Sequence, residues 1–208
     1  IILDGGTGTD IQRRGAPMSG DTWCADANLT HPEIVRTVHL DYIRAGADII
    51  TANTFATSPI LFSHIGRPDD VARIDAIAVT LAREATAGTE VCVAGSMSTM
   101  RPMAPGTDRN NLNFVLSERD ARALFQAKAN GLKACGWVLI MMELMRDTDY
   151  AVWASETALA TGLPVWTGLS AERGKDGKLQ GWGRDDCPFD DIARTLAALK
   201  PAVMMVMH

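Results

Sequence analysis

The feature that most constrains the fold is a regular alternation of short apolar runs with segments of helical periodicity. The apolar runs cover residues 1–4, 47–55, 90–97, 138–145, 164–170 and 202–208. They are apolar almost throughout, which is typical of parallel strands with both faces covered. The segments between them predict helices at 30–46, 69–86, 117–134, 148–161 and 189–199. The alternation therefore predicts an α/β fold with a parallel sheet and right-handed crossovers.

The clearest predicted helix lies in the segment THPEIVRTVHLDYIRAG. Thr30 is a suitable capping residue, Pro32 suits the first turn, and Gly46 can end the helix. We expect His31 and His39, which lie on this helix, to have surface or capping roles.

Two architectures fit the alternation, an open doubly wound sheet and a closed barrel, and periodicity does not separate them. A (β/α)8 barrel has eight strands and about 250 residues, whereas this chain has 208 residues and about six βα units. Residues 1–208 contain no linker, so we expect a single domain, incomplete at its C-terminal end if it is a barrel. The turn-rich stretches 96–111 and 170–188 predict loops over one end of the sheet.

Composition narrows the class of partner. The chain is 47% hydrophobic and 22% charged with a net charge of −5, which is typical of a globular protein. Its Lys and Arg residues are scattered, so neither a nucleic acid nor a membrane surface is an expected partner. No apolar run reaches the roughly 20 residues of a bilayer-spanning helix, and we expect no signal peptide. We expect a cytoplasmic protein that acts on small molecules, with its oligomeric state open.

Polar and glycine residues collect where the apolar runs end. Ligands of parallel α/β folds bind beyond the carboxyl ends of the strands, so these residues are candidates for a site. The candidates are Asp4, Gly5, Gly6, Asn53, Thr54, Phe55, Ser96, Glu143, Ser170 and His208.

Glu143 is the sharpest of these signals, because it places one carboxylate inside the apolar run LIMMELM. An unpaired charge there would cost several kcal/mol, so a cationic partner is expected. Two interpretations stand open from the run alone: a buried ion pair with an Arg or Lys, or a clamp for the ammonium group of a substrate.

The other candidates carry similar alternatives. Asp4 and the glycines after it form either a tight turn or a carboxylate beside a backbone that a ligand can approach. Their spacing does not match G-x-G-x-x-G, which disfavours a dinucleotide site. Asn53 either donates to a substrate carboxylate or holds the adjacent loop. No G-x-S-x-G elbow is present, so serine-hydrolase chemistry has no support.

Taken together, LDGGTGTDIQRRG, NLTHPEIVRTVHLDYIRAGADIITANTF, GSM and LIMMELM resemble the homocysteine S-methyltransferase family. The resemblance implies a (β/α)8 barrel that moves a methyl group onto the thiol of homocysteine, a reaction of methionine biosynthesis, with zinc held by three cysteine thiolates. It further implies that Asp4 and Gly5 line the amino-acid pocket, that Asn53 supports it, and that Glu143 binds the ammonium group. Asp4 and Glu143 are then the expected catalytic residues.

One part of the family pattern is missing. Met207 and His208 stand where the resemblance implies an Asn-Cys pair with the first zinc ligand, and no Cys-Cys pair follows. The four cysteines, Cys24, Cys92, Cys135 and Cys187, lie far apart in sequence and match neither that pattern nor a disulfide framework. His208 is a candidate metal ligand, although a lone histidine is more often a hydrogen-bonding group or general base.

Three functions follow as hypotheses. The first is methyl transfer from a small donor to the thiol of homocysteine or a related acceptor. The second is a zinc-free or differently metallated relative that acts on another methylated small molecule. The third is a non-catalytic amino-acid-binding domain. The sequence leaves the donor open among S-methylmethionine, betaine, a folate and a corrinoid protein.

Overall fold

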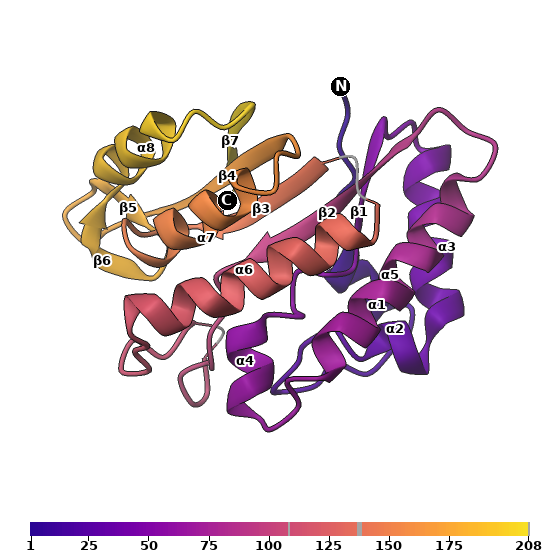
Figure 1. The fold of residues 1–208 in the computed structure, drawn as a ribbon, viewed down its shortest axis with the longest axis horizontal. Helices are drawn as coiled ribbons and strands as arrows, with labels where there is room; N and C mark the ends of the chain where they lie inside the picture. Colours follow the sequence, from indigo (N-terminus) through magenta and orange to yellow (C-terminus); the bar gives the residue numbers. More distant parts are fainter. Residues whose placement is uncertain (108, 137–138, 208) are drawn as a thin grey trace.

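The structure, a computed structural model, contains the predicted alternation of strands and helices, with additional short helices and a β-hairpin (Figure 1). The structure describes residues 1–107, 109–136 and 139–207. The helices are α1 (Thr7–Arg13), α2 (Ala27–Thr30), α3 (Pro32–Arg44), α4 (Pro59–His64), α5 (Asp70–Thr86), α6 (Glu118–Ala134), α7 (Tyr150–Leu159) and α8 (Phe189–Ala198). The strands are β1 (Ile49–Ala52), β2 (Cys92–Ser98), β3 (Leu139–Met145), β4 (Val165–Arg173), β5 (Leu179–Gly181), β6 (Arg184–Pro188) and β7 (Val203–Met207).

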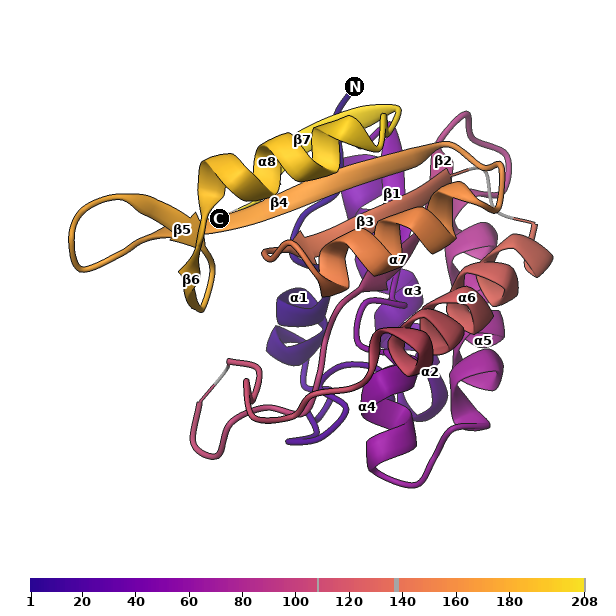
Figure 2. The same cartoon turned by 60° about the vertical axis from the view of Figure 1, so that its left-hand side comes forward.

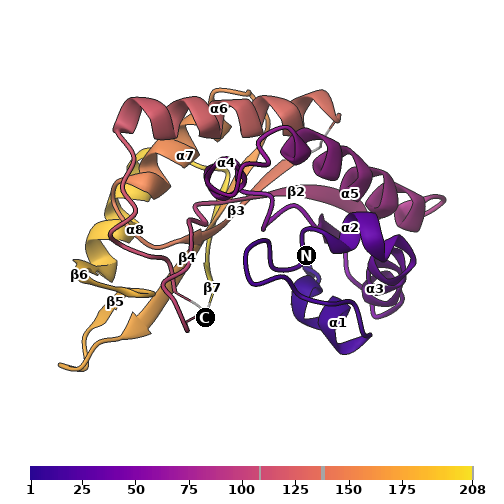
Figure 3. The same cartoon turned by 90° about the horizontal axis from the view of Figure 1, so that it is seen from below.

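The parallel strands lie side by side in the order in which they occur in the chain. Leu3 forms a parallel bridge with Ile49, and β1, β2, β3, β4 and β7 then follow as parallel neighbours. At least one helix intervenes between each pair of consecutive parallel strands. Figure 3 shows α5 to α8 as an arc along one side of this sheet. A doubly wound sheet would reverse its strand order, so the winding is that of a barrel.

The described residues do not form a closed barrel. Within the described residues, the N-terminal segment and β7 each pair with one neighbouring strand only. The fold is therefore an α/β domain with a mostly parallel sheet and barrel-type winding, and the predicted eight-stranded closure is not shown.

Side chains alternate between two apolar clusters on the two faces of the sheet. Ile140 and Met142 of β3 pack against the helices, in the cluster that contains Phe125 of α6. Leu139 and Met141 point to the opposite face and pack with Ile49 and Ala94, beside Leu3, Trp166 and Met205. Because successive strand residues face opposite sides, residues 139, 141 and 143 share this second face.

Helix α3 differs from the prediction at Thr30 and at His39. Its N-cap is His31, whose side chain makes no capping hydrogen bond, while Thr30 ends α2 and donates instead to the carbonyl of Asp26. His39 is fully buried rather than at the surface, and burial lowers its pKa to about 4. His39 lies on the same side of α3 as the buried residues Val35 and Val38.

The stretch after the fifth predicted strand is a β-hairpin rather than a loop. β4 continues to Arg173, and β5 and β6 pair antiparallel beyond it, so that the hairpin projects past the sheet (Figure 2). Gly181 permits this packing, because a Cβ atom there would lie 2.0 Å from the carbonyl oxygen of Arg146. The other turn-rich stretch, after β2, has one isolated bridge, between Met103 and Asn110. In the ranges that the structure describes, no helix has the length and apolar character needed to cross a bilayer.

Candidate active site

A cavity of about 420 Å³ lies at the carboxyl ends of the parallel strands. The N-terminal segment and strands β1, β2, β3 and β7 contribute to its wall, whereas β4 does not. The lining residues are 3–9 in the N-terminal segment, Trp23 and Cys24, 51–53 and Phe55 around the end of β1, Ser96 of β2, Met141, Glu143 and Leu144 of β3, and 205–207 of β7.

Glu143 projects into this cavity from β3. Its position follows from strand alternation, since Leu139 and Met141 occupy the same face. The pKa of Glu143 is raised to about 7, first by burial and then by the negative charge of Asp4, while the hydroxyl of Ser96 lowers it. No Arg or Lys contributes to this shift, so the buried ion pair, one of the two sequence-based interpretations, is not found among the described residues.

Asp4 reaches the same cavity from the first parallel strand position. Its carboxylate accepts hydrogen bonds from the backbone N–H of Thr51 (2.7 Å) and from the Thr51 hydroxyl (3.0 Å). Burial raises the pKa of Asp4 to about 6, although these bonds oppose the rise. Thr51 therefore fixes the orientation of the carboxylate without neutralising it.

Together, Asp4 and Glu143 place two carboxyl groups in one cavity. Each carboxylate is partly desolvated, and the charge of Asp4 makes ionisation of Glu143 harder. A positively charged group in the cavity would stabilise both ionised forms, because an opposite charge within a few ångströms favours the charged state.

Two residues of the cavity wall have left-handed backbones that are unusual outside glycine. Leu144 has φ 62° at an irregularity in the β3–β4 register between Met142 and Met145. Trp23 has φ 46° and stacks edge-on against Phe55, with ring centroids 5.6 Å apart. Such conformations persist only where the surroundings hold them, and they concentrate at functional sites.

The side chain of Asn53 holds the Trp23 segment in place. Its Nδ2 donates to the carbonyl of Cys24 (3.0 Å) and to Oδ1 of Asn28 (3.3 Å). Its Oδ1 accepts from the thiol of Cys24 at 3.0 Å, and burial raises the pKa of that thiol to about 12. The geometry corresponds to the loop-holding alternative for Asn53.

The whole chain matches one known family. A family model described as homocysteine S-methyltransferase covers residues 1–207. The chain belongs to the homocysteine S-methyltransferase family. Among relatives, it is 46% identical over 54 residues to selenocysteine Se-methyltransferase of Brassica oleracea var. italica, covering 26% of this chain and 16% of that protein. It is 27% identical over 223 aligned positions to betaine–homocysteine S-methyltransferase 1 of Danio rerio, covering 98% of this chain and 53% of that protein.

A solved structure of the family agrees with the fold. The metallated form of the homocysteine methyltransferase MmuM from Escherichia coli superposes with a TM-score of 0.79 at 24% identity. The match covers 99% of this chain and 74% of that one. At this identity the likeness bears on the fold alone. The chain spans about half the length of betaine–homocysteine S-methyltransferase 1 of Danio rerio.

Most of the site residues that the sequence predicted come together. Asp4, Gly5, Gly6, Asn53, Phe55, Ser96 and Glu143 all line the cavity. Thr54 and Ser170 do not line it. The hydroxyl of Thr54 instead links β1 to β2 by bonding both the backbone N–H and the carbonyl of Ser96, each at 2.9 Å. Ser170 is fully buried in β4 beside Met207 of β7.

The zinc site expected for the family does not fit the described side chains. No group of three His, Cys, Asp or Glu residues among them is arranged to hold a metal. Of the cysteines, only Cys24 lines the cavity, and it is hydrogen-bonded to Asn53. The predicted ligand His208 lies outside the described residues.

Sequence reasoning missed Trp23, Cys24 and Leu144 as members of the cavity wall. Trp23 and Cys24 follow no apolar run, so nothing in the periodicity connected them with the strand ends. Leu144 belongs to a predicted strand, where alternation would turn it away from Glu143, and only the bulge in β3 brings both residues to the cavity.

Proposed function

We propose that this protein transfers a methyl group from a small cationic donor to the thiol of homocysteine or a closely related amino acid. The observation that carries the proposal is the pair of carboxylates, Asp4 and Glu143, which face one cavity to which the described residues contribute no Arg or Lys. Membership of the family supports the reaction class.

Asp4 and Glu143 bind the ammonium group of the amino acid. The ammonium supplies the opposite charge that both buried carboxylates require. The backbone at Gly5 and Gly6 lies at the cavity wall, so a ligand can approach it closely. Asn53 acts indirectly, because its hydrogen bonds hold the Cys24 segment against the cavity.

The aromatic pair of Trp23 and Phe55 receives the methyl donor. A methyl group leaves most readily from a positively charged nitrogen or sulfur, and such onium groups bind against aromatic faces. The names of the relatives include betaine as a donor and selenocysteine as an acceptor. These compounds are the first to test on this chain.

The chemical step is a direct displacement. The acceptor thiolate attacks the methyl carbon, a carbon–sulfur bond forms, and the electron pair of the breaking bond returns to the onium atom. The thiol proton leaves to solvent before the attack. Holding sulfur, carbon and leaving atom in line supplies a large part of the rate enhancement.

Zinc activation of the thiol stays a prediction that rests on the family resemblance. We route no step through a metal, because the described side chains do not form a ligand set. Elemental analysis of the full-length protein, with and without homocysteine, is the test. The cytoplasmic location is likewise a prediction from sequence.

The experiment is a methionine-formation assay on the full-length protein, with L-homocysteine and either betaine or S-methylmethionine. We expect turnover with one of these donors and a fall of about 100-fold or more in kcat/KM for homocysteine in Glu143→Gln. Glu84→Gln is the matched control, since Glu84 lies on α5 with a side chain 55% exposed. Binding of homocysteine without turnover would instead identify a non-catalytic binding domain.

A further inference from the structure

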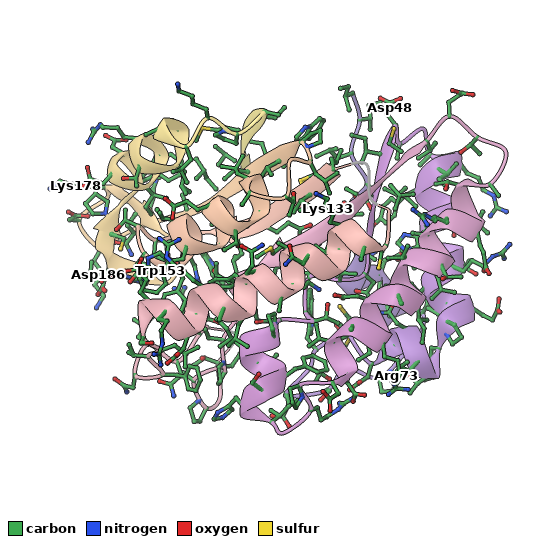
Figure 4. The ribbon with its side chains drawn as sticks, viewed as in Figure 1. Asp48, Arg73, Lys133, Trp153, Lys178 and Asp186 are labelled. Carbon is green, nitrogen blue, oxygen red and sulfur yellow. The ribbon has the colours of Figure 1, made fainter. Side chains whose placement is uncertain are left out.

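Three buried arginines gather beyond the carboxyl ends of the strands, outside the active-site cavity. Arg101 follows β2, Arg146 follows β3, and Arg184 lies in β6 of the hairpin. Figure 4 labels Lys178 and Asp186, which mark that hairpin. Arg101 and Arg146 are 3% and 1% exposed, and none of the three arginines lines the cavity that contains Asp4 and Glu143.

The three arginines differ in their hydrogen-bond and ion-pair partners. Arg184 donates to Asp147 at 2.9 Å and makes two hydrogen bonds to Asp186, at 2.8 and 3.0 Å. Arg101 approaches Asp147 only to 3.8 Å. Arg146 makes one long hydrogen bond, from Nη1 to the carbonyl of Trp182 at 3.4 Å. Asp147 is therefore engaged mainly by Arg184.

The same two atoms are unsatisfied in Arg101 and in Arg146. Within the described part of the chain, Nε and Nη2 of both side chains are buried without a hydrogen-bond partner. Nε and Nη2 form one edge of the guanidinium, and this edge binds two oxygens of a carboxylate or phosphate at once. Among the described residues, two such edges are therefore buried without hydrogen-bond partners, on arginines that both lie near Asp147.

The flat faces of these guanidinium groups are already covered. Arg101 lies over the ring of Tyr150, 4.1 Å from its centroid, and Arg146 lies 5.4 Å from the centroid of Trp182. Stacking fixes the plane of each guanidinium and leaves the edge for a ligand. The neighbouring Arg109 binds a carboxylate in a bidentate manner through its other edge, from Nη1 and Nη2 to the two oxygens of Glu172, at 2.9 and 2.8 Å.

The electrostatics around Arg146 favour an additional negative charge. Burial lowers the pKa of Arg146 to about 10; Asp147 opposes this change, and the positive charges of Arg101, Arg184 and Arg109 add to it. The nearby carboxylates Asp147, Asp186 and Glu172 make their hydrogen bonds mainly with Arg184 and Arg109. A further anion would therefore offset the charges of Arg101 and Arg146.

We propose that Arg101 and Arg146 form a binding site for an oxyanion, a carboxylate or a phosphate, that is separate from the active-site cavity of Asp4 and Glu143. The anion is either a free small molecule or the acidic group of a longer substrate. The proposal does not depend on the proposed methyl transfer, because binding is measured without acceptor or donor.

The first test is calorimetric titration of the full-length protein with inorganic phosphate and, separately, with succinate. We expect saturable binding of at least one anion, weakened about tenfold or more in Arg146→Lys and in Arg101→Lys, which keep the charge but lose the fork. Arg194→Lys is the control, because Arg194 is exposed on α8 and pairs with Asp191. Absence of binding, or equal binding in both Lys variants and wild type, would overturn the proposal.

A second measurement distinguishes anion binding by these arginines from a purely structural role. Phosphate at about 100 times its Kd should raise the unfolding midpoint of the wild type by about 5 °C or more and leave Arg146→Lys nearly unchanged. A structural role predicts equal loss of stability with and without phosphate, which would contradict the proposal. Competition between succinate and betaine would assign the site to the acidic group of the donor, and independent binding would assign it to a free anion.

Discussion

Gly8 shows how one residue positions the wall of the active site. It lies within α1, where alanine would ordinarily be favoured over glycine. A Cβ atom at Gly8, however, would lie 2.8 Å from the ring of Trp23 and 3.0 Å from the sulfur of Cys24. The absence of a side chain therefore lets the Trp23 segment pack onto α1.

We expect Gly8→Ala to lower the free energy of unfolding by about 1–3 kcal/mol through overpacking. The displaced indole should also change the intrinsic fluorescence and weaken donor binding. Gly131→Ala is the matched control, because Gly131 lies in α6 with nothing within 4 Å of its added Cβ. The control should gain about 0.5–1 kcal/mol. Urea denaturation of both variants measures the difference, and equal stabilisation would contradict this account of Gly8.

At the scale of elements, a buried ion pair ties two helices to the loop that follows β1. Lys128 of α6 bonds both oxygens of Asp75 of α5, at 2.7 and 2.6 Å, and also the hydroxyl of Thr57 and the carbonyl of Thr54. Lys128 and Asp75 are each 3% exposed. Because Thr54 also bonds Ser96, the network supports the segment next to Asn53.

We expect Lys128→Met to destabilise the protein by about 3–5 kcal/mol, because it leaves the carboxylate of Asp75 buried and unpaired. The double variant with Asp75→Leu should recover a large part of this loss, since neither charge then remains. Thermal or urea denaturation of the single and double variants completes a mutant cycle. Additive losses in the double variant would show that the pair is not coupled.

At the scale of the whole molecule, the two site carboxyls make stability depend on pH. Their pKa values are raised, from 3.8 to about 6 for Asp4 and from 4.5 to about 7 for Glu143. The unfolded chain therefore releases these protons at lower pH than the folded protein. The stability they contribute is fully present below about pH 4 and is lost as pH rises through 6 to 7.

Without ligand, the double variant Asp4→Asn with Glu143→Gln should match the wild type near pH 4 and exceed it near pH 8. The gain should be at most about 6 kcal/mol, since a pKa change of one corresponds to about 1.4 kcal/mol. Urea denaturation between pH 4 and 8 measures it, with Glu84→Gln as control. Homocysteine should bind the wild type more tightly as both carboxyls ionise. A difference between variant and wild type that does not change with pH would contradict this assignment.

Much of the fold follows from local pattern. Helices α5, α6, α7 and α8 lie within one or two residues of their predicted ranges, because apolar periodicity and capping residues such as Ser117 are local signals. The single-domain organisation of residues 1–208 stays a prediction. The hairpin β5–β6 escaped prediction because its strands are short and polar, and packing of Gly181 on the Arg146 backbone supports it.

The sequence alone determined the parallel α/β class and the placement of Asp4 and Glu143 at strand ends, since both depend on residue order and alternation. Tertiary contacts decided the sequential winding of the sheet and the cavity that Asp4 and Glu143 share. They also decided the burial of the unsatisfied guanidinium edges of Arg101 and Arg146. The reason is that these features join residues far apart in the chain, as Asp4 joins Thr51, over separations at which local periodicity carries no information.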